Sequence, residues 1–396
     1  MEKVDLVIVG AGIVGMAIAD RLKQRSPGLD IAILDKESDV AQHASGRNSG
    51  VLHAGFYYTA DSLKARLTVA GNTAMREFCQ AQGIGINECG KLVVATNRAE
   101  LKQLKTLEAR GQANGSAVSI ISAAEAERIE PNVRTYEQAL WSPRTATVDP
   151  KEVCLALKSK LLAAGVRFFT NTKVLSIQGS LLHTDKGSFA FGKLVNCAGL
   201  YADRLAQQCG FGKDYIMIPF KGLYLKYPGN PTNIKTNIYP VPNLKNPFLG
   251  VHFTVTKSGL VKLGPTATPA LWRENYRGLD RFSFRELVET LSWESLLFVT
   301  NAFGFRNLAF EEMQKYRKRF FVDQARKLVK EMDDASVGDW SEPGIRAQLL
   351  NKKTKQLVQD FIVEGDSRSV HILNAVSPGF TCSFPFAEYV IEKYLT

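Results

Sequence analysis

Short apolar runs and a helical pattern alternate at the beginning of the chain. Residues 4–9 form an apolar run, broken only by Asp5, of the kind that fits a buried parallel strand. A helical pattern follows as far as Arg25 and stops near Pro27. A second apolar run at residues 31–35 predicts a second strand. The pattern therefore predicts a strand–helix–strand unit at the amino terminus.

Three glycines lie between the first strand and the helix in the spacing Gly-x-Gly-x-x-Gly. Gly10 permits a tight turn, Gly12 lets the backbone approach a pyrophosphate, and Gly15 lets the helix lie close to the strand. The free N–H groups at the helix N-terminus attract phosphate charge. Asp35 ends the second strand, where its carboxylate can accept hydrogen bonds from ribose hydroxyls. This order predicts dinucleotide binding and leaves FAD and NAD both open.

Three later segments favour FAD, because they bring both ends of the chain to one extended ligand. A turn of small and polar residues around Arg47 suits the pyrophosphate and ribityl chain, with an ordinary surface turn as the alternative. A later apolar strand ends in the small residues Ala198 and Gly199. Such residues allow a cofactor to pass close to the backbone; the alternative is an ordinary strand-to-helix turn. A third segment precedes the last helix, whose N–H groups can be directed at a reduced flavin. The candidate cofactor residues beyond the glycine motif and Asp35 are Lys36, Ser45, Arg47, Asn48, Ser49, Gly50, Val174, Ala198, Gly199, Gly344, Arg346, Pro378, Gly379, Phe380 and Thr381.

The alternation of strands and helices predicts an α/β protein with two lobes, which a length of 396 residues also favours. A Rossmann-like FAD-binding domain with a mainly parallel, doubly wound sheet is assigned to residues 1–88, 146–215 and 340–396. A substrate-binding domain of α+β type takes residues 89–145 and 216–339.

The second lobe carries several short runs typical of strands, so a mixed or antiparallel sheet is expected there. These runs lie at residues 91–95, 223–227, 249–255 and 260–263. Helices are expected at residues 284–298 and 308–332.

Composition narrows the classes of function. The chain is 45% hydrophobic and 22% charged, as in ordinary soluble globular proteins, and its net charge is +11. That charge suits an anionic substrate, anionic lipid or nucleic acid, of which nucleic acid has the weakest support and is not expected as a partner. The six cysteines form no CxxC pair, so neither a disulfide framework nor a metal site is predicted. No apolar run is long enough to span a bilayer.

Several further segments, spread over nearly the whole chain, carry a family pattern. The segment NSGVLHAGFYY at residues 48–58 and the segment GKLVVA at 90–95 are the most specific. Others are WSP at 141–143, TVDP at 147–150, PFKG at 219–222, VHFT at 251–254, Gly264-Pro265, RENY at 273–276, GIRAQ at 344–348 and Asp360-Phe361. With these motifs the chain resembles the D-amino-acid-oxidase/glycerol-3-phosphate-dehydrogenase superfamily of FAD oxidoreductases, and within it the L-2-hydroxyglutarate dehydrogenases or oxidases.

The resemblance implies oxidation of a small 2-hydroxy acid, with L-2-hydroxyglutarate the preferred substrate and 2-oxoglutarate the product. It implies hydride transfer to flavin N5 and onward transfer of electrons to a quinone or to oxygen. The chain departs from the family at Gly222-Leu-Tyr224, where Gly-Glu-Tyr is usual, and at the ribose position, where Asp35 replaces the common Glu. It departs again at Ser377-Pro-Gly-Phe-Thr381.

Oxidation of a 2-hydroxy acid requires a base for the hydroxyl proton and donors that hold the carboxylates. His53 is the candidate base, because an imidazole has a pKa near the working pH; a flavin contact or a structural role is the alternative. Arg346 is the candidate carboxylate ligand, because a guanidinium matches a carboxylate with two hydrogen bonds; the alternative is a surface arginine.

The second lobe supplies further candidates for substrate binding. Lys221, Tyr224 and His252 are assigned to the distal carboxylate of a dicarboxylic substrate, and Tyr57 and Tyr58 to the cap of the pocket. Half-buried packing in the core is the alternative for the tyrosines.

The expected location is the cytoplasm, with peripheral contact to the inner face of the cytoplasmic membrane. Residues 310–321 interleave basic and aromatic side chains on an expected helix, which suits anionic lipid or, alternatively, a helix packed on the substrate sheet with a solvated basic face. Other functions kept open are an amino-acid or secondary-amine oxidase, a glycerol-3-phosphate dehydrogenase, an FAD-dependent tRNA-modifying protein and a flavin-binding interaction protein.

Overall fold

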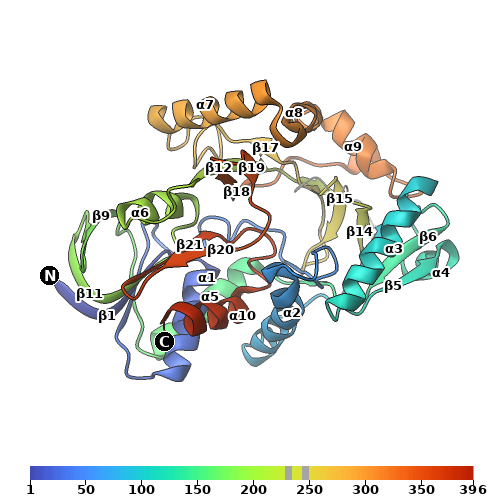
Figure 1. Ribbon diagram of the computed structural model, residues 1–396. Coiled ribbons are helices and arrows are strands. Elements are labelled where there is room, and N and C mark those ends of the chain that lie inside the picture. Colours follow the sequence, from blue (N-terminus) through green and yellow to red (C-terminus); the bar gives the residue numbers. More distant parts are fainter. Residues whose placement is uncertain (228–233, 243–248, 396) are drawn as a thin grey trace.

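A computed structural model describes residues 1–227, 234–242 and 249–395. Its largest sheet lies in the left half of Figure 1 and has the strand order β20-β21-β11-β1-β2-β8, with a β9–β10 hairpin attached to β11. The strands of this sheet are β1 (Glu2–Val9), β2 (Ile31–Leu34), β8 (Arg167–Phe169), β9 (Val174–Gln178), β10 (Leu181–Thr184), β11 (Gly187–Asn196), β20 (Ile362–Gly365) and β21 (Ser369–Asn374). The central strands from β21 to β8 pair in parallel, as the sequence predicted.

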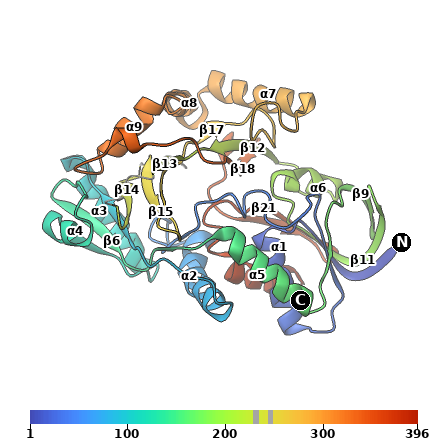
Figure 2. The same ribbon diagram turned by 180° about the vertical axis from the view of Figure 1, so that it is seen from behind.

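Helices cover both faces of this sheet because its strands are apolar on both sides. Leu6 and Ile8 of β1 pack toward the helices α1, α2, α5 and α10, whereas Val7 and Val9 pack toward α6. The helices involved are α1 (Ile13–Arg25), α2 (Leu63–Ala81), α5 (Pro150–Ala163), α6 (Ala202–Gln208) and α10 (Ser383–Val390). The two termini therefore contribute to one layered unit, in which α1 and α10 lie side by side (Figures 1 and 2).

A second sheet has the order β13-β16-β15-β14-β4-β6-β5 and is mixed, because only β14 and β4 pair in parallel. Its strands are β4 (Lys91–Val94), β5 (Ser119–Ser122), β6 (Gln138–Ser142), β13 (Leu225–Tyr227), β14 (Asn237–Pro240), β15 (His252–Val255) and β16 (Val261–Gly264). The helices α3 (Arg98–Ala113) and α4 (Ala123–Ile129) pack beside it. The sheet confirms the predicted mixed-sheet second lobe.

The described residues also form two smaller sheets. One has the order β17-β12-β18-β19 and consists of β12 (Tyr215–Gly222), β17 (Thr268–Pro269), β18 (Gly344–Asn351) and β19 (Gln356–Leu357). The other pairs β3 (Val51–Leu52) with β7 (Ala146–Thr147). The first of them joins strands from both proposed domains, and the domain boundaries given above stay a prediction.

The single helix expected at residues 308–332 is wrong. The structure has α8 (Phe305–Gln314) and α9 (Lys318–Arg326), which follow α7 (Phe284–Thr300) along the upper edge of Figure 1. Between α8 and α9, Arg317 takes an extended conformation (φ −81°, ψ 109°). After this break, Phe321, Val322 and Ala325 of α9 pack in the core of the second sheet. The basic and aromatic stretch at 310–321 is therefore divided between two helices.

Candidate active site

The glycine loop between β1 and α1 has the geometry that its spacing predicts. Gly10 has φ +109°, and a Cβ atom there would lie 2.3 Å from the carbonyl oxygen of Cys197. A Cβ on Gly15 would lie 2.3 Å from the carbonyl oxygen of Gly10, so only glycine lets α1 approach the strand this closely. A Cβ on Gly12 would lie 3.0 Å from Ser45 Oγ, and the residue faces a pocket.

Asp35 lies directly after β2, next to the glycine loop. Its Oδ2 accepts a hydrogen bond from the Ala11 N–H at 2.8 Å, and its Oδ1 accepts one from the Glu37 N–H at 2.9 Å. These bonds fix the carboxylate and leave lone pairs for further donors. Val174 begins β9, two residues after Thr172, whose N–H donates to the Asp35 carbonyl at 2.8 Å.

The polar turn after β2 folds over the beginning of α1. Ser45 Oγ accepts a hydrogen bond from the Ile13 N–H at 2.9 Å. The Asn48 side chain donates to the carbonyls of Ala44 and Ser45 and accepts from the Gly50 N–H, and so holds the turn closed. The turn is thus a rigid backbone frame around the helix N-terminus.

Two neighbouring segments complete this frame. Arg47 donates from Nε to the Gln42 carbonyl at 2.7 Å, and its guanidinium lies over the Tyr276 ring at 4.5 Å. A Cβ on Gly344 would lie 2.5 Å from the Arg47 carbonyl oxygen, so β18 begins in close contact with the turn. A side-chain hydrogen bond joins Ser49 and Tyr224, and it lowers the pKa of Tyr224, as a bond donated to the phenol oxygen does.

The segment before α10 is bound to the strand that precedes His53. Thr381 Oγ1 donates to the Val51 carbonyl and accepts from the His53 N–H, both at 3.2 Å. Among the described residues, the backbone N–H groups of Phe380 and Thr381 have no acceptor, and both residues line the pocket. They are donors available to an anionic ligand, as the sequence predicted for a flavin.

One pocket joins the glycine loop, the polar turn and the carboxy-terminal segment. Its lining includes Gly12–Gly15, Ala44–Ser45, Arg47–Ser49, Val51, His53, Cys197, Gly199, Tyr224, Gly344–Ala347 and Ile372–Leu373 with Ala375–Thr381. A helix N-terminus, glycine-rich walls and free N–H donors along a single groove fit an extended dinucleotide. Ala198 lies between the lining residues Cys197 and Gly199.

His53 lies in this pocket after β3. Its Nε2 is 3.5 Å from Ser377 Oγ, and its Nδ1 is buried without a hydrogen-bond partner among the described residues. Burial lowers the pKa of His53 well below 6.5, and the charge of Lys91 lowers it further, ahead of His252. The imidazole is therefore neutral near pH 7 and has a lone pair that can accept a proton.

Arg346 lies on β18 opposite Phe220 of β12, and both line the same pocket as His53. Burial lowers the pKa of Arg346, although the guanidinium keeps its charge at neutral pH. Tyr224 and Tyr58 lie close enough to interact electrostatically with this charge. Burial raises the pKa of Tyr224 to about 12, so this phenol stays protonated and can donate a hydrogen bond.

The other predicted substrate residues are divided between two places. Lys221 neighbours Phe220 in sequence, so it points to the opposite face of β12, where it donates to Asn275 at 3.1 Å. It does not line the pocket. His252 is buried on β15 and donates from Nδ1 to the Gly250 carbonyl at 2.8 Å. Burial lowers the pKa of His252 to about 3, so it carries no positive charge near pH 7.

Lys91 is a residue that the sequence reasoning did not select. It begins β4, is fully buried, and has no hydrogen-bond partner for its Nζ among the described residues. Tyr57, predicted as part of the cap, lies beside it with its hydroxyl also buried and unpartnered. The available signal was a lysine within the apolar segment GKLVVA, because lysine is almost never fully buried without a reason.

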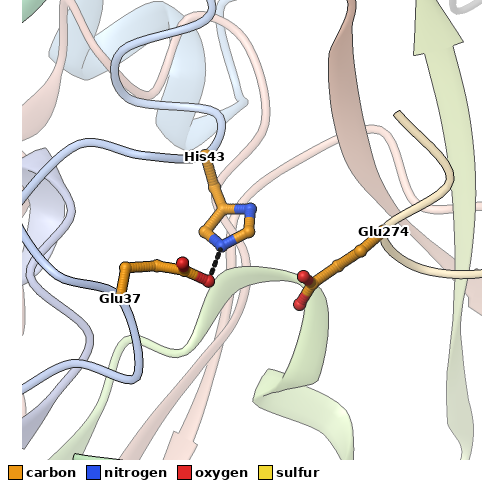
Figure 3. Close-up of side chains that lie close together, drawn as sticks. All are labelled: Glu37, His43 and Glu274. Carbon is orange, nitrogen blue, oxygen red and sulfur yellow. Dashed lines mark hydrogen bonds and ion pairs between the residues drawn. The ribbon is translucent and has the colours of Figure 1, made fainter. Parts of the chain in front are cut away.

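A second polar cluster lies near the polar turn and is drawn in Figure 3. His43 Nε2 is 2.8 Å from the Glu37 carboxylate, and the carboxylate of Glu274 faces both residues from another segment. Lys36 and Arg281 each form ion pairs with both glutamates. The two carboxylates are thus balanced by two cations of the chain, so we assign the cluster to structure rather than to a metal ion.

This polar cluster also explains two pKa shifts. Hydrogen bonds from Arg281 and His43 hold the pKa of Glu37 far below its usual range. Burial raises the pKa of Glu274, but Lys36 and Arg281 outweigh burial and leave it lowered. Lys36, predicted as a cofactor residue, lies in this cluster and not in the pocket of His53.

The fold and this pocket define a class of flavin-dependent oxidoreductases. The sequence profile described as "FAD dependent oxidoreductase" matches residues 5–393, and the chain belongs to this family, which uses FAD as its cofactor. The predicted cofactor and fold class are thereby confirmed. Among solved structures, an L-alpha-glycerophosphate oxidase from Mycoplasma pneumoniae with FAD bound has a TM-score of 0.80 at 23% identity, covering 99% of this chain and 94% of that one. A glycine oxidase from Geobacillus kaustophilus has a TM-score of 0.72 at 20% identity, covering 100% and 96%.

The curated relatives are more similar in sequence. An L-2-hydroxyglutarate dehydrogenase from Indibacter alkaliphilus is 36% identical, and the alignment covers 98% of each chain. The mitochondrial L-2-hydroxyglutarate dehydrogenase from Homo sapiens is 35% identical over 98% of this chain and 88% of that protein. These relatives confirm the resemblance on which the sequence analysis relied.

Proposed function

We propose that this chain oxidises L-2-hydroxyglutarate to 2-oxoglutarate. Relatives named for that substrate align with 98% of the chain, which favours it over an amine, an amino acid or glycerol 3-phosphate. The glycine loop and the segment before α10 would hold FAD, which would supply the acceptor for the hydride of the substrate α-carbon. The same oxidation releases the hydroxyl proton, and the C–O single bond becomes a carbonyl.

The observation that carries this proposal is that His53 and Arg346 line one pocket with residues from both ends of the chain. His53 accepts the hydroxyl proton, because its imidazole is neutral near pH 7. Arg346 binds the α-carboxylate through two hydrogen bonds and thereby orients the α-carbon. Tyr224, close to Arg346, donates a further hydrogen bond from its protonated hydroxyl.

Anaerobic reduction of the bound flavin tests this function directly. The FAD-loaded protein is mixed with L-2-hydroxyglutarate, its D enantiomer, lactate, glycine, proline and glycerol 3-phosphate, and absorbance near 450 nm is followed over about a minute. We expect L-2-hydroxyglutarate to bleach the flavin fastest. Faster bleaching by an amino acid or by glycerol 3-phosphate would overturn the substrate. A flavin inert to every donor would favour an interaction protein, and retention of tRNA by that inert protein would favour tRNA modification.

We propose further that the electrons leave to a quinone at a membrane surface, through contact made by α7 and α8. No helix among the described residues is long and apolar enough to cross a membrane. Instead, α7 exposes an apolar stripe at positions repeated with helical spacing. The stripe consists of Phe284, Val288, Leu291, Phe298 and Val299, and α8 adds Phe310 and Met313. The Phe298 and Phe310 rings are 5.9 Å apart, which joins the two helices into one surface.

The charges beside this apolar surface fit anionic lipid. Arg285, Arg306, Arg317 and Arg319 are exposed on or next to α7 and α8. An apolar surface with flanking arginines can insert at the headgroup level of a bilayer and attract anionic lipid. The expected membrane contact therefore moves from residues 310–321 alone to the combined α7–α8 surface, which lies along the upper edge of Figure 1.

Vesicle sedimentation tests this contact. Leu291→Asp combined with Val299→Asp is compared with Leu155→Asp plus Leu162→Asp, two exposed leucines of α5. We expect only the first pair to abolish sedimentation with vesicles that contain phosphatidylglycerol, and high salt to weaken the wild-type binding. Equal sedimentation of both double variants would contradict the assignment.

The electron acceptor is tested by the rate at which the reduced flavin is reoxidised. We expect a membrane quinone to reoxidise the flavin faster than oxygen does. Faster reoxidation by oxygen would make the protein an oxidase.

A further inference from the structure

Lys91 is a buried lysine surrounded by aromatic rings. Its Nζ lies 4.0 Å from the centre of the Tyr239 ring, 5.4 Å from that of Tyr57 and 5.9 Å from that of Phe56. Its exposed fraction is 0%, and its Nζ has no hydrogen-bond partner among the described residues. Aromatic faces attract an ammonium group, but they cannot replace the hydrogen bonds that it loses on leaving water.

The strand register places Lys91 on the face of the second sheet that is turned toward His53. Tyr239 pairs with Val93 of β4, so it shares a face with Lys91, two residues away. His252 stacks on Tyr239 with 3.6 Å between the ring centres. The loop that follows His53 supplies Phe56 and Tyr57 to the same cage. Sheet and loop therefore meet at this ammonium group.

Three buried polar atoms in this small region lack a partner among the described residues. They are Lys91 Nζ, Tyr57 Oη and His53 Nδ1. Buried polar groups in proteins are nearly always hydrogen-bonded, so an unpartnered set next to a proposed active site points to a ligand that completes it. An ammonium group and a phenol hydroxyl are both donors toward a carboxylate.

Other buried cations of the chain show that this arrangement is unusual. Lys315 is also buried, and it forms an ion pair with the buried carboxylate of Glu312. Arg273 is buried and is paired with Asp203, with one N–O distance of 2.9 Å. The cage of Lys91 contains no such carboxylate among the described residues. Burial consequently lowers the pKa of Lys91 to about 7.

We propose that Lys91 binds the distal carboxylate of the substrate and so makes the enzyme specific for dicarboxylic 2-hydroxy acids. The inference rests on the proposed function, in which Arg346 binds the α-carboxylate. It replaces the assignment of the distal carboxylate to Lys221, which points away from the pocket, and to His252, which is neutral. Two cations on different sheets then hold the two carboxylates. Lys91 is not among the residues that line the pocket of His53 and Arg346, but it lies close enough to His53 to interact with it electrostatically.

Substrate preference tests this role. Lys91→Met removes the charge and keeps an unbranched side chain that is one atom shorter. The variant is compared with wild type on L-2-hydroxyglutarate and on L-2-hydroxypentanoate, which has a methyl group in place of the distal carboxylate. We expect kcat/KM for flavin reduction by L-2-hydroxyglutarate to fall about 10- to 100-fold, as for loss of a charged hydrogen bond. The value for L-2-hydroxypentanoate should stay unchanged or rise, so the preference collapses.

Control variants separate this role from a structural one. Lys226→Met changes an exposed lysine of the same sheet and should leave the preference intact. Lys91→Arg keeps a charge and should retain part of the preference for the dicarboxylate. This variant also provides the test if Lys91→Met does not fold. An equal loss on both substrates, or an unchanged preference in folded Lys91→Met, would overturn the proposal.

A binding measurement keeps this proposal distinct from the proposed function. Glutarate has both carboxylates but no hydroxyl group, so it can perturb the flavin spectrum without being oxidised. Wild type should bind glutarate more tightly than pentanoate, and Lys91→Met should lose this difference. If wild type fails to oxidise L-2-hydroxyglutarate but shows this Lys91-dependent binding, the function is wrong and the dicarboxylate site stands. If wild type oxidises the substrate and the affinity for glutarate is the same in Lys91→Met, only the inference about Lys91 is wrong.

Discussion

The cluster drawn in Figure 3 and the region of His53 differ in how their charges are balanced. In the cluster of Glu37, Glu274, Lys36 and Arg281, each carboxylate contacts both cations, and His43 adds a hydrogen bond. In the region of His53, by contrast, the ammonium group of Lys91 is buried without a partner among the described residues. Both clusters join segments that are far apart in the sequence.

This difference separates stabilising interactions from binding interactions. A buried charge that is paired can hold a fold together, whereas a buried charge that lacks a partner destabilises the fold until a ligand supplies one. The balanced cluster therefore fastens the polar turn to the segment that carries Glu274 and Arg281. The region of His53 keeps its unpaired donors for a carboxylate substrate.

Removal of the proposed base should give the largest effect. We expect His53→Ala to slow anaerobic flavin reduction by L-2-hydroxyglutarate about 10²- to 10⁴-fold, because no other group near the substrate hydroxyl is assigned to accept its proton. Stopped-flow absorbance measures the rate, and the flavin content of the purified variant serves as the control. Near-normal turnover with full flavin occupancy would remove His53 from this role.

Arg346→Lys should have a smaller effect, concentrated in substrate binding. Lysine keeps the charge but lacks the planar fork that matches a carboxylate, so KM for L-2-hydroxyglutarate should rise about 10- to 100-fold. Steady-state kinetics with an artificial electron acceptor measure KM and kcat separately. An unchanged KM would show that Arg346 does not bind the α-carboxylate.

The pH dependence of the two substrates should differ because of Lys91. Burial gives Lys91 a pKa of about 7, so above that pH the free enzyme loses the charge that binds the distal carboxylate. The pKa of His53 lies well below 6.5 and that of His252 is about 3, while Tyr57, Tyr239 and Cys89 stay protonated near pH 7. Burial lowers the pKa of Lys64 to about 8, but Lys64 acts on His53 and Arg346 and should therefore affect both substrates alike. We expect kcat/KM for L-2-hydroxyglutarate to fall up to about tenfold per pH unit above 7, with a flatter profile for L-2-hydroxypentanoate. Parallel profiles for the two substrates would contradict this.

Disruption of the balanced cluster should change stability and leave the chemistry nearly unaltered. Glu274→Gln leaves Lys36 and Arg281 short of one carboxylate, and we expect a loss of about 1–3 kcal/mol in the free energy of unfolding. The pKa values of Glu37 and Glu274 are lower in the folded protein than the usual 4.5. Their contribution to the free energy of unfolding is therefore present above about pH 4.5 and is lost as the pH falls below that value.

Denaturant titration of the FAD-loaded protein at pH 7 and pH 4 measures this contribution. The difference in the free energy of unfolding between wild type and Glu274→Gln should be smaller at pH 4 than at pH 7. The rate at which the variant's flavin is reduced at pH 7 should remain within about twofold of wild type. A large loss of rate without a loss of stability would place Glu274 in the active site instead.

Local sequence patterns predicted the cofactor part of the molecule well. The glycines at positions 10, 12 and 15 impose a turn and a helix–strand contact that any fold containing them must satisfy. The apolar runs around them predicted β1, α1 and β2 nearly to the residue. The placement of His53 and Arg346 in one pocket followed from motif order, although their catalytic and binding roles remain proposals.

By itself, then, the sequence determined the dinucleotide turn and the parallel sheet, because these depend on backbone freedom and apolar spacing over short stretches. The choice of FAD over NAD came from motifs spread over the whole chain. Only the tertiary structure decided which charged groups are paired. Lys221 contacts Asn275 and Lys36 contacts Glu274, whereas Lys91 lies among aromatic rings with no hydrogen-bond partner in the described part of the chain. The tertiary structure also decided where the helix expected at 308–332 breaks. Pairing and burial depend on segments far apart in the sequence, 54 residues for Lys221 and Asn275 and 238 for Lys36 and Glu274, and local patterns carry no information about such contacts.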